Sequence, residues 1–245
     1  MLASGGCVVL QDGFSAGAVL EAIARHRITR VYLPPHLLYQ VLDHPDLERT
    51  DTSSLMCVTY TGCAASPERL AQAVRRLGPV LYQSYSLTEC GIVTRLHPDE
   101  HLDARLLATA GRALPDTAVR ILGDDGRPLP GATGEICVRT PTSGAGYWRK
   151  PELTARTLRE GWFHTGDLGS LDARGYLTVA GRRTPMAIVD AHNLFPRDIE
   201  EPLLAHPAVQ DAVMFTTTGP DNLETVHAAV TTTPGTRATT AQLHR

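Results

Sequence analysis

The strongest constraint on the fold is an alternation of helical and extended patterns in the first half of the chain. Apolar residues at helical spacing in residues 15–26 are followed by the extended segment ITRVYL (28–33). The pattern then repeats, because LMCVTY (55–60) is extended, SPERLAQAVRRLG (66–78) is helical and PVLYQSY (79–85) is extended. Such alternation predicts a parallel sheet covered by helices.

The expected helix borders carry their own signals. Ser15 and Ser66 stand where a side chain can cap a helix, Pro67 follows at the first helical position, and Gly78 stands just after the last turn. These residues predict helices that begin after residues 15 and 66.

From about residue 110 the pattern changes to short strands separated by turns, such as TAVRIL (117–122), EICVRT (135–140) and GYLTVAG (175–181). After GRRTP (181–185), the segments to residue 232 alternate in the order β, α, β, β. We therefore expect an α/β and α+β protein divided into an α/β subdomain (1–110), a β-rich subdomain (111–180), a hinge (181–185) and an incomplete small α+β domain (186–245).

Charge and cysteine content limit which partners the chain is expected to bind and in which cellular compartment it is expected. The 26 acidic and 23 basic residues form no basic run, so nucleic acid is not an expected partner. Charged residues interrupt every apolar stretch before the ~20 residues of a membrane span, and the N-terminus lacks the basic start of a signal peptide. A cytoplasmic protein is expected. Five cysteines without a CxxC pair predict reduced thiols and argue against a zinc site.

The segment YQSYSLTEC (82–90) ends a predicted parallel strand, where α/β sheets bind ligands. Tyr85 offers an aromatic face for a base, Thr88 a hydroxyl for a phosphate, and Glu89 a carboxylate for Mg²⁺. The alternative is a strand end with a solvated glutamate.

The segment GWFHTGDLG (161–169) is expected to place Asp167 in a glycine-flanked turn between strands. A carboxylate there can accept hydrogen bonds from both hydroxyls of a ribose. The alternative is an aspartate that bonds to its own turn. His164 is expected to pack or to shape the turn.

The order of the motifs resembles the adenylate-forming enzymes, namely acyl-CoA synthetases, aryl-CoA ligases, luciferases and the adenylation domains of peptide synthetases. The matching segments are TGCAASPERL (61–70), YSLTE (85–89), AGRALPDTAVRIL (110–122), GEICVRTPTSGAGYWRKPELT (134–154), WFHTGDLG (162–169), GYLTVAGRR (175–183) and NLFPRDIEEPLLAHPAVQDAVMF (193–215). The resemblance implies the C-terminal half of the large adenylation domain followed by part of the small domain.

The resemblance also implies roles and cofactors. Tyr85 would stack on adenine, Thr88 would contact phosphate and Glu89 would hold Mg²⁺. Asp167 would bind the ribose hydroxyls and Arg182 would approach the ribose and phosphate. The loop Gly62, Cys63 and Ala64 would line the adenine and acyl pocket. ATP or AMP, Mg²⁺ and a coenzyme A or pantetheine thiol are the implied cofactors, and residues 192–196 would contribute to the thiol tunnel.

This sequence departs from the family pattern in several places. It has no glycine-rich phosphate loop with its lysine and no C-terminal catalytic lysine, since its one lysine, Lys150, matches a surface position. Thr184 and Pro185 occupy the hinge motif, and a proline there restricts rotation. Ser86 and Ala191 stand where glycines are usual.

The sequence leaves two functions open. One is half of an acyl-CoA ligase-like enzyme that activates a carboxylic acid with ATP and passes the acyl group to a thiol; it would be inactive in adenylation without a complementing polypeptide. The other is a remnant that binds a nucleotide or an acyl thioester for a regulatory, scaffolding or other acyl-transfer role. Expected partners are a small carboxylic acid or acyl thioester, a complementing polypeptide or carrier protein, and further copies of the chain joined through uncovered sheet edges.

Overall fold

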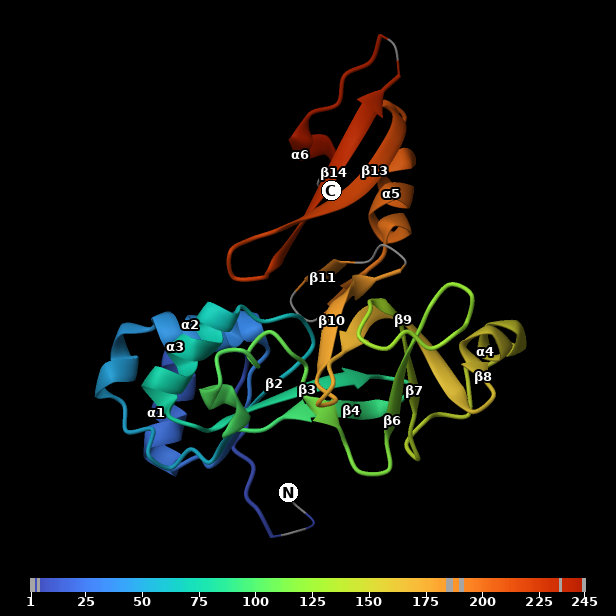
Figure 1. Ribbon diagram of the computed structural model, residues 1–245. Coiled ribbons are helices and arrows are strands. Elements are labelled where there is room, and N and C mark those ends of the chain that lie inside the picture. Colours follow the sequence, from blue (N-terminus) through green and yellow to red (C-terminus); the bar gives the residue numbers. More distant parts are fainter. Residues whose placement is uncertain (1–2, 4, 184–186, 190–191, 234, 244–245) are drawn as a thin grey trace.

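The computed structural model describes residues 3, 5–183, 187–189, 192–233 and 235–243. In this part of the chain two five-stranded sheets lie side by side, and a smaller α+β region follows them (Figure 1). The expected positions Thr184, Pro185 and Ala191 lie outside the described residues.

The first sheet has the strand order β1-β2-β3-β4-β5. Its strands are β1 (Arg30–Tyr32), β2 (Cys57–Tyr60), β3 (Leu81–Leu87), β4 (Gly91–Leu96) and β5 (Arg112–Ala113). The first three are parallel, as the sequence predicts, whereas β4 and β5 pair antiparallel. The reason is the length of the connection: residues 88–90 make a turn, and a parallel strand would need a crossover of a dozen or more residues. The strand β5 pairs with the first sheet although it follows residue 110.

The helices of this half are α1 (Ala16–His26), α2 (Pro35–Asp43) and α3 (Pro67–Leu77), with short 3-10 turns at η2 (Pro45–Arg49) and η3 (Glu100–Leu102). The α3 borders are as predicted, since Ser66 Oγ accepts from the Arg69 amide at 3.5 Å and Gly78 ends the helix at φ 81°. Ser15 stands at the N-cap of α1, but its side chain makes no capping hydrogen bond. That part of the prediction is wrong.

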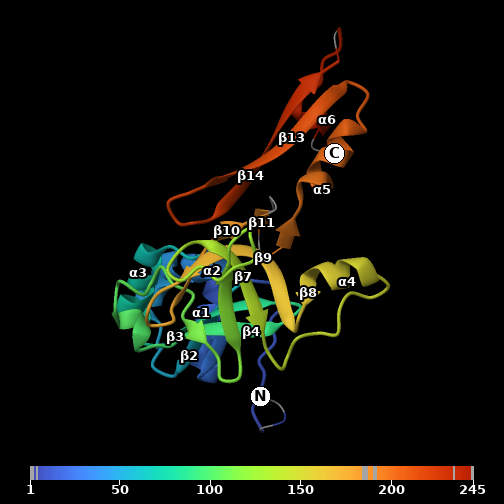
Figure 2. The ribbon, with the colours of Figure 1, turned by 45° about the vertical axis from the view of Figure 1, so that its right-hand side comes forward.

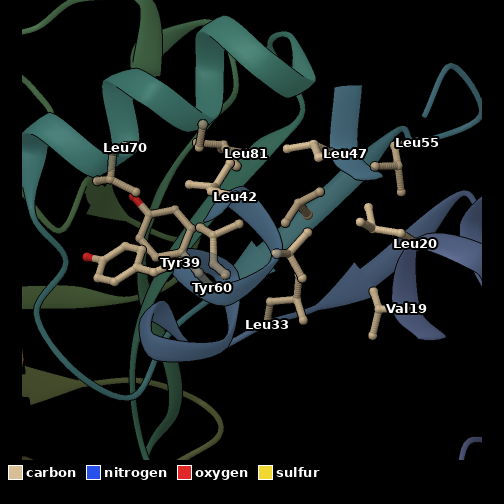
Figure 3. Packing of buried hydrophobic residues seen from close by; sticks show 14 of the residues in the cluster. Val19, Leu20, Leu33, Tyr39, Leu42, Leu47, Leu55, Tyr60, Leu70 and Leu81 are labelled. Carbon is tan, nitrogen blue, oxygen red and sulfur yellow. The ribbon is translucent and has the colours of Figure 1, made fainter. Parts of the chain in front are cut away.

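A single apolar core joins these helices to the parallel strands (Figure 3). Leu20 of α1, Leu42 of α2 and Leu70 of α3 are at most 1% exposed, and they meet Val58 of β2 and Leu81 of β3. This cluster fixes the helices against β2 and β3, and therefore fixes the loops that leave those strands.

The second sheet has the order β10-β9-β7-β6, with β8 paired to β9, and all its pairs are antiparallel. Its elements are β6 (Ala118–Leu122), β7 (Gly134–Arg139), β8 (Leu158–Arg159), β9 (Trp162–Leu171) and β10 (Leu177–Arg182), with α4 (Pro151–Thr157) before β8. A second core of Leu87, Val93, Ile136, Phe163 and Leu177 holds the two sheets together.

The sequence prediction that Asp167 lies in a turn is wrong. The strand β9 runs without a break from Trp162 to Leu171, and Asp167 lies within it. Gly166 adopts φ 73°, and between Glu135 and Cys137 the pairing with β7 skips from Leu168 to His164. The glycines therefore serve an irregularity inside a strand rather than a reversal of the chain.

The remaining elements are β11 (Ala187–Val189), β12 (His192–Leu194), α5 (Pro196–Leu204), β13 (Val209–Thr218), β14 (Glu224–Thr232) and α6 (Thr240–Leu243). Their order contains the predicted β, α, β, β, with β12 as an added short strand. In Figures 1 and 2 this region extends away from the two sheets, while the loop between β13 and β14 turns back toward them. At that loop the Asn222 side-chain amide donates to the Ala65 carbonyl at 3.0 Å, and the Tyr39 hydroxyl donates to the Asp221 carbonyl at 3.2 Å.

The cysteines and the lengths of the helices bear on two of the sequence predictions. All five cysteines are free, with Cys57, Cys90 and Cys137 buried, as reduced thiols require. Across the described ranges, none of the helices combines the length and apolar character needed to cross a membrane.

Candidate functional site

A cavity of about 470 Å³ lies where the loop after β2, the end of β3, the middle of β9 and the end of β10 meet the loop between β13 and β14. Six of the eight predicted site residues line it: Gly62, Cys63, Ala64, Tyr85, Asp167 and Arg182. These six residues come from positions up to 120 apart in the sequence and meet at one place.

Asp167 is at the centre of the polar contacts in the cavity. Its Oδ1 is 2.6 Å from Arg182 Nε, and its Oδ2 accepts a hydrogen bond of 2.5 Å from the Tyr85 hydroxyl. The side chain is 5% exposed. Burial raises the pKa of the Asp167 carboxyl above its ordinary value, although the contacts with Tyr85 and Arg182 act in the opposite direction.

The two strands that carry this contact are both irregular at the contact point. The pairing of β3 with β4 shifts register between Tyr85 and Ser86, and the pairing of β9 with β7 and β10 shifts around Asp167. Irregularities of this kind turn a side chain out of the alternation of the strand. Here they bring a side chain from each sheet into one cavity.

Tyr85 keeps its proton under all ordinary conditions. Burial, followed by the charge of Asp167, raises the pKa of Tyr85 well above its usual value. The phenol is therefore a hydrogen-bond donor to Asp167, and its ring lines the cavity. An aromatic ring beside a carboxylate and a guanidinium can stack a planar base while the charged groups bind polar substituents.

The loop Gly62, Cys63 and Ala64 presents small side chains to the cavity, and Gly62 adopts φ 101°. Burial, with a smaller effect of the Glu224 charge, raises the pKa of the Cys63 thiol to about 11. A thiol with such a pKa is a poor nucleophile at neutral pH, so Cys63 shapes the cavity rather than reacting. Ser86 also lines the cavity, and its hydroxyl is 3.3 Å from that of Thr61.

Thr88 and Glu89 lie outside the cavity lining, in the turn between β3 and β4. Thr88 is exposed. The Glu89 carboxylate accepts a hydrogen bond of 2.6 Å from the Tyr147 hydroxyl, and its backbone carbonyl accepts from the Gly144 amide at 2.8 Å. Its negative charge adds to the rise in the Asp167 pKa, which places the two carboxylates within electrostatic range.

Sequence reasoning missed several residues of the site. The end of β13, the loop after it and the start of β14 line the cavity with Thr218, Asn222, Leu223 and Glu224, and no local signal connects them with residues 62–65. Tyr147 lies in a segment that carries the family resemblance, GAGYW, but its contact with Glu89 depends on the tertiary fold. Lys150 is exposed at the start of α4, in agreement with the expectation of a surface position.

The donors and acceptors of the cavity suit a ribonucleoside monophosphate. Asp167 can accept from vicinal hydroxyls, Arg182 can pair with an anion, and the small loop residues leave room for a planar base beside Tyr85. The cavity volume is in the range of small-molecule sites.

Comparisons with known proteins point to the same group of enzymes. Residues 1–148 match the family described as AMP-binding enzyme. The medium/long-chain-fatty-acid–CoA ligase FadD8 of Mycobacterium tuberculosis is 40% identical over 207 residues, which cover 84% of this chain and 36% of that protein.

Two solved structures extend the match. The amide bond synthetase McbA from Marinactinospora thermotolerans superposes with a TM-score of 0.95 at 44% identity, covering 99% of this chain and 49% of that one. The O-succinylbenzoate coenzyme A synthetase MenE from Bacillus subtilis, in complex with AMP, gives a TM-score of 0.64 at 29% identity over 94% of this chain and 46% of that one. The chain thus spans less than half the length of each of these three proteins. The match over residues 1–148 and the agreement in fold show that the chain belongs to the AMP-binding enzyme family.

Proposed function

We propose that this chain forms the nucleotide-binding part of an acyl-CoA ligase-like enzyme, which activates a carboxylic acid with ATP as an acyl-adenylate and passes the acyl group to a thiol. The observation that supports this most is the buried Asp167 carboxylate, held between Tyr85 and Arg182 at the wall of a cavity of suitable size.

In this proposal the site residues act as binding groups. The ring of Tyr85 stacks on adenine, and the oxygens of Asp167 accept from the ribose hydroxyls. Arg182 pairs with Asp167 before binding and turns part of its guanidinium toward the ribose and α-phosphate afterwards. Gly62, Cys63 and Ala64 border the base and the acyl group because their side chains are small.

Thr88 and Glu89 serve the phosphates in this proposal. Glu89 is half-buried, and the turn around it is fixed by the Gly144 amide and the Tyr147 hydroxyl, which suits a carboxylate that holds Mg²⁺ together with phosphate oxygens. The bound Mg²⁺ would neutralise negative charge on the phosphates. The exposed Thr88 hydroxyl would donate to a phosphate oxygen.

The proposal includes the domain boundaries after residues 110, 180 and 185. Residues 181–185 form the hinge to the small domain. In the described structure, the β13–β14 loop already reaches the cavity, so movement at such a hinge would open or close one wall of it. The expected thiol tunnel near residues 192–196 would form on closure.

An amine is a second candidate for the acceptor of the activated acyl group. McbA, which matches 99% of this chain, is named an amide bond synthetase. In this chain Glu224, the first residue of β14, lines the cavity, and its charge adds to the rise in the pKa of Cys63. A carboxylate at that place attracts an ammonium group and repels the phosphates of a nucleotide thiol such as coenzyme A. Glu224→Gln would weaken binding of an amine acceptor and leave AMP affinity unchanged.

We further propose that activity requires protein surface beyond these residues. The edge strand β1 and the segment before it expose Val8, Leu10, Phe14 and Tyr32, and a groove of about 590 Å³ runs between this segment and α1. A complementing polypeptide or a second copy of the chain would cover this edge. A monomer by light scattering at micromolar concentration would count against self-association.

The experiment that tests the function compares AMP with a non-hydrolysable acyl-adenylate analogue by calorimetric titration of the chain. The proposal predicts that both bind at one site and that the acyl group strengthens binding by at least tenfold, because it adds apolar contacts in the cavity. If the two ligands bind with equal affinity, the cavity does not bind the acyl group, although it still binds the nucleotide. If neither ligand binds at millimolar concentration, the proposed function is wrong.

A further inference from the structure

Three possible metal ligands meet on the second sheet, apart from the cavity. Glu135 and Cys137 are two positions apart on β7, and Cys137 is paired in register with His164 on β9. The His164 Nδ1 atom is 3.0 Å from Glu135 Oε2 and 3.4 Å from Cys137 Sγ. All three ligand atoms lie within 4.8 Å of one another. Antiparallel pairing thus brings together residues that show no metal-binding spacing in the sequence.

The donor set and the separations suit a tetrahedral metal ion. Zinc takes thiolate, imidazole and carboxylate ligands at about 2.0–2.3 Å, for which neighbouring ligand atoms in a tetrahedron are about 3.3–3.8 Å apart. The separations from Nδ1 are close to that range, so small side-chain rotations would be enough. Three protein ligands leave one position for water.

The cluster is shielded from solvent without being closed. Cys137 is fully buried, and the side chains of His164 and Glu135 are 11% and 16% exposed. Partial burial lowers the competition from water for a bound ion, while the remaining opening gives an ion access.

The hydrogen bonding of His164 is in conflict without a metal. Arg159 Nη2 lies 2.9 Å from His164 Nδ1 and can only donate, so it requires a bare nitrogen. Glu135 Oε2 lies 3.0 Å from the same nitrogen and can only accept, so it requires an N–H. One nitrogen cannot satisfy both neighbours at once. A cation at this place would accept the lone pair of Nδ1 and attract the carboxylate.

Two positively charged side chains, those of Arg159 and Arg120, and the thiol proton of Cys137 disfavour binding of a cation. Arg159 is exposed and can turn away into solvent, whereas Arg120 stays against Cys137 and the ring of Trp162. Burial, with the charge of Glu135, raises the pKa of the Cys137 thiol to about 11. Binding therefore releases the Cys137 proton to the buffer, and affinity should increase with pH.

We propose that Glu135, Cys137 and His164 form a binding site for a zinc-type divalent cation that links β7 to β9. The linkage begins three residues before Asp167 on the same strand, so an occupied site would limit movement of the strand that carries the cavity carboxylate. The site does not depend on the proposed enzymatic function.

The test is a titration of the full chain with Co²⁺ followed by displacement with Zn²⁺. A cobalt ion bound to a thiolate gives a charge-transfer band in the near ultraviolet. The proposal predicts a saturable band at one ion per chain, which Zn²⁺ removes and Cys137→Ser abolishes. Cys7→Ser is the matched control, because Cys7 is exposed and far from the cluster in sequence, and this variant should keep the band.

Further variants separate a metal site from an ordinary ion-pair cluster. Glu135→Gln and His164→Ala each remove a direct ligand and should weaken cobalt affinity by at least about 10- to 100-fold, the loss typical when only an outer-shell partner of a ligand is removed. Arg159→Ala should strengthen it, because this change removes a positive charge and a competitor for Nδ1. A band that survives Cys137→Ser, or no saturable binding by the wild-type chain at millimolar cobalt, would overturn the proposal. Circular dichroism verifies that each variant is folded.

Discussion

The hydroxyl of Tyr85 on β3 donates a hydrogen bond of 2.5 Å to Asp167 on β9, and this contact joins the two sheets at the wall of the cavity. Because Arg182 occupies the other carboxylate oxygen, both oxygens of Asp167 already have a partner. A ribose bound there, as we propose, would have to share these oxygens or displace a partner. The contact therefore orients the carboxylate and at the same time competes with a ligand.

The ring and the hydroxyl of Tyr85 should contribute differently to AMP binding. Tyr85→Ala removes the stacking surface and should weaken AMP affinity by about 10- to 100-fold, since stacking of a base on an aromatic side chain is worth ~1–3 kcal/mol. Tyr85→Phe keeps the ring and frees one oxygen of Asp167, so affinity should change little or increase. Calorimetric titration checks both variants, and a large loss in Tyr85→Phe would show that the hydroxyl itself binds the ligand.

Gly111 should be among the least replaceable residues of the fold. It adopts φ 76°. A Cβ at this position would overlap the backbone carbonyl of Arg95 on β4. Gly111→Ala should lower the free energy of unfolding by about 3 kcal/mol or more. The matched control is Gly126→Ala, at φ 75° with open space around it, which should cost only about 1–2 kcal/mol. Equal losses in urea denaturation would contradict the predicted overlap.

His101 should make stability depend on pH. It is 2% exposed; Nε2 is 2.9 Å from the Tyr60 hydroxyl and Nδ1 donates to the His97 carbonyl, so the ring is satisfied when neutral. Burial lowers the pKa of His101 below its ordinary value of 6.5, although the charges of Glu100 and Asp99 oppose this. The unfolded chain then binds the extra proton between these two pKa values. Stability from this group is present above pH 6.5 and is lost as the pH falls toward the lowered pKa.

The pH effect can be isolated by substitution. His101→Gln should reduce the slope of unfolding free energy against pH below pH 6.5, by up to about 1.4 kcal/mol per pH unit for one proton. His26→Gln replaces an exposed histidine and should leave the slope unchanged. The same slope in wild type and His101→Gln would assign the acid sensitivity to other groups.

The β13–β14 loop should be held to the first half of the chain by Asn222. This residue adopts φ 57°, which asparagine and glycine tolerate, and its amide donates to the Ala65 carbonyl. Asn222→Gly keeps the backbone conformation and removes the bond, so amide exchange in residues 219–224 should become about 2- to 10-fold faster, as a bond of ~0.5–1.5 kcal/mol implies.

A hydroxyl elsewhere in the same hairpin provides the control for Asn222. Thr217→Ala removes a bond to His227 that stays within the hairpin, and it should leave amide exchange in residues 219–224 close to the wild-type rate. Unchanged exchange in Asn222→Gly would mean that the apolar contact of Leu223 with the first core holds the loop.

Much of the fold could be predicted from local sequence patterns, because the ends of a helix and the alternation of a strand depend on neighbouring residues. Ser66, Pro67 and Gly78 mark the ends of α3 through their own backbone chemistry, and the alternation of residues 55–85 yields the parallel strands β2 and β3. The antiparallel course of β4 and the continuity of β9 through Gly166 depend on which strands are neighbours. Glycines on either side of Asp167 look the same in sequence whether they serve a turn or an irregular strand.

The candidate site was predictable where residues lie on recurring motifs. The motifs gave Tyr85, Asp167 and Arg182, which the fold brings into contact. The contributions of Asn222 and Glu224, and the cluster around His164, arise from the packing of distant segments. No spacing rule along a single chain encodes such contacts.

The most direct measurement of the central claim is calorimetric titration of the chain with AMP, in wild type and in Asp167→Ala. The proposed function makes Asp167 the buried acceptor for the ribose, so AMP should bind the wild type near micromolar concentration and show no detectable binding to Asp167→Ala. Glu152→Gln, an exposed carboxylate on α4, should bind AMP as the wild type does. The account is contradicted if Asp167→Ala binds AMP with wild-type affinity, or if the folded wild-type chain shows no binding at millimolar AMP.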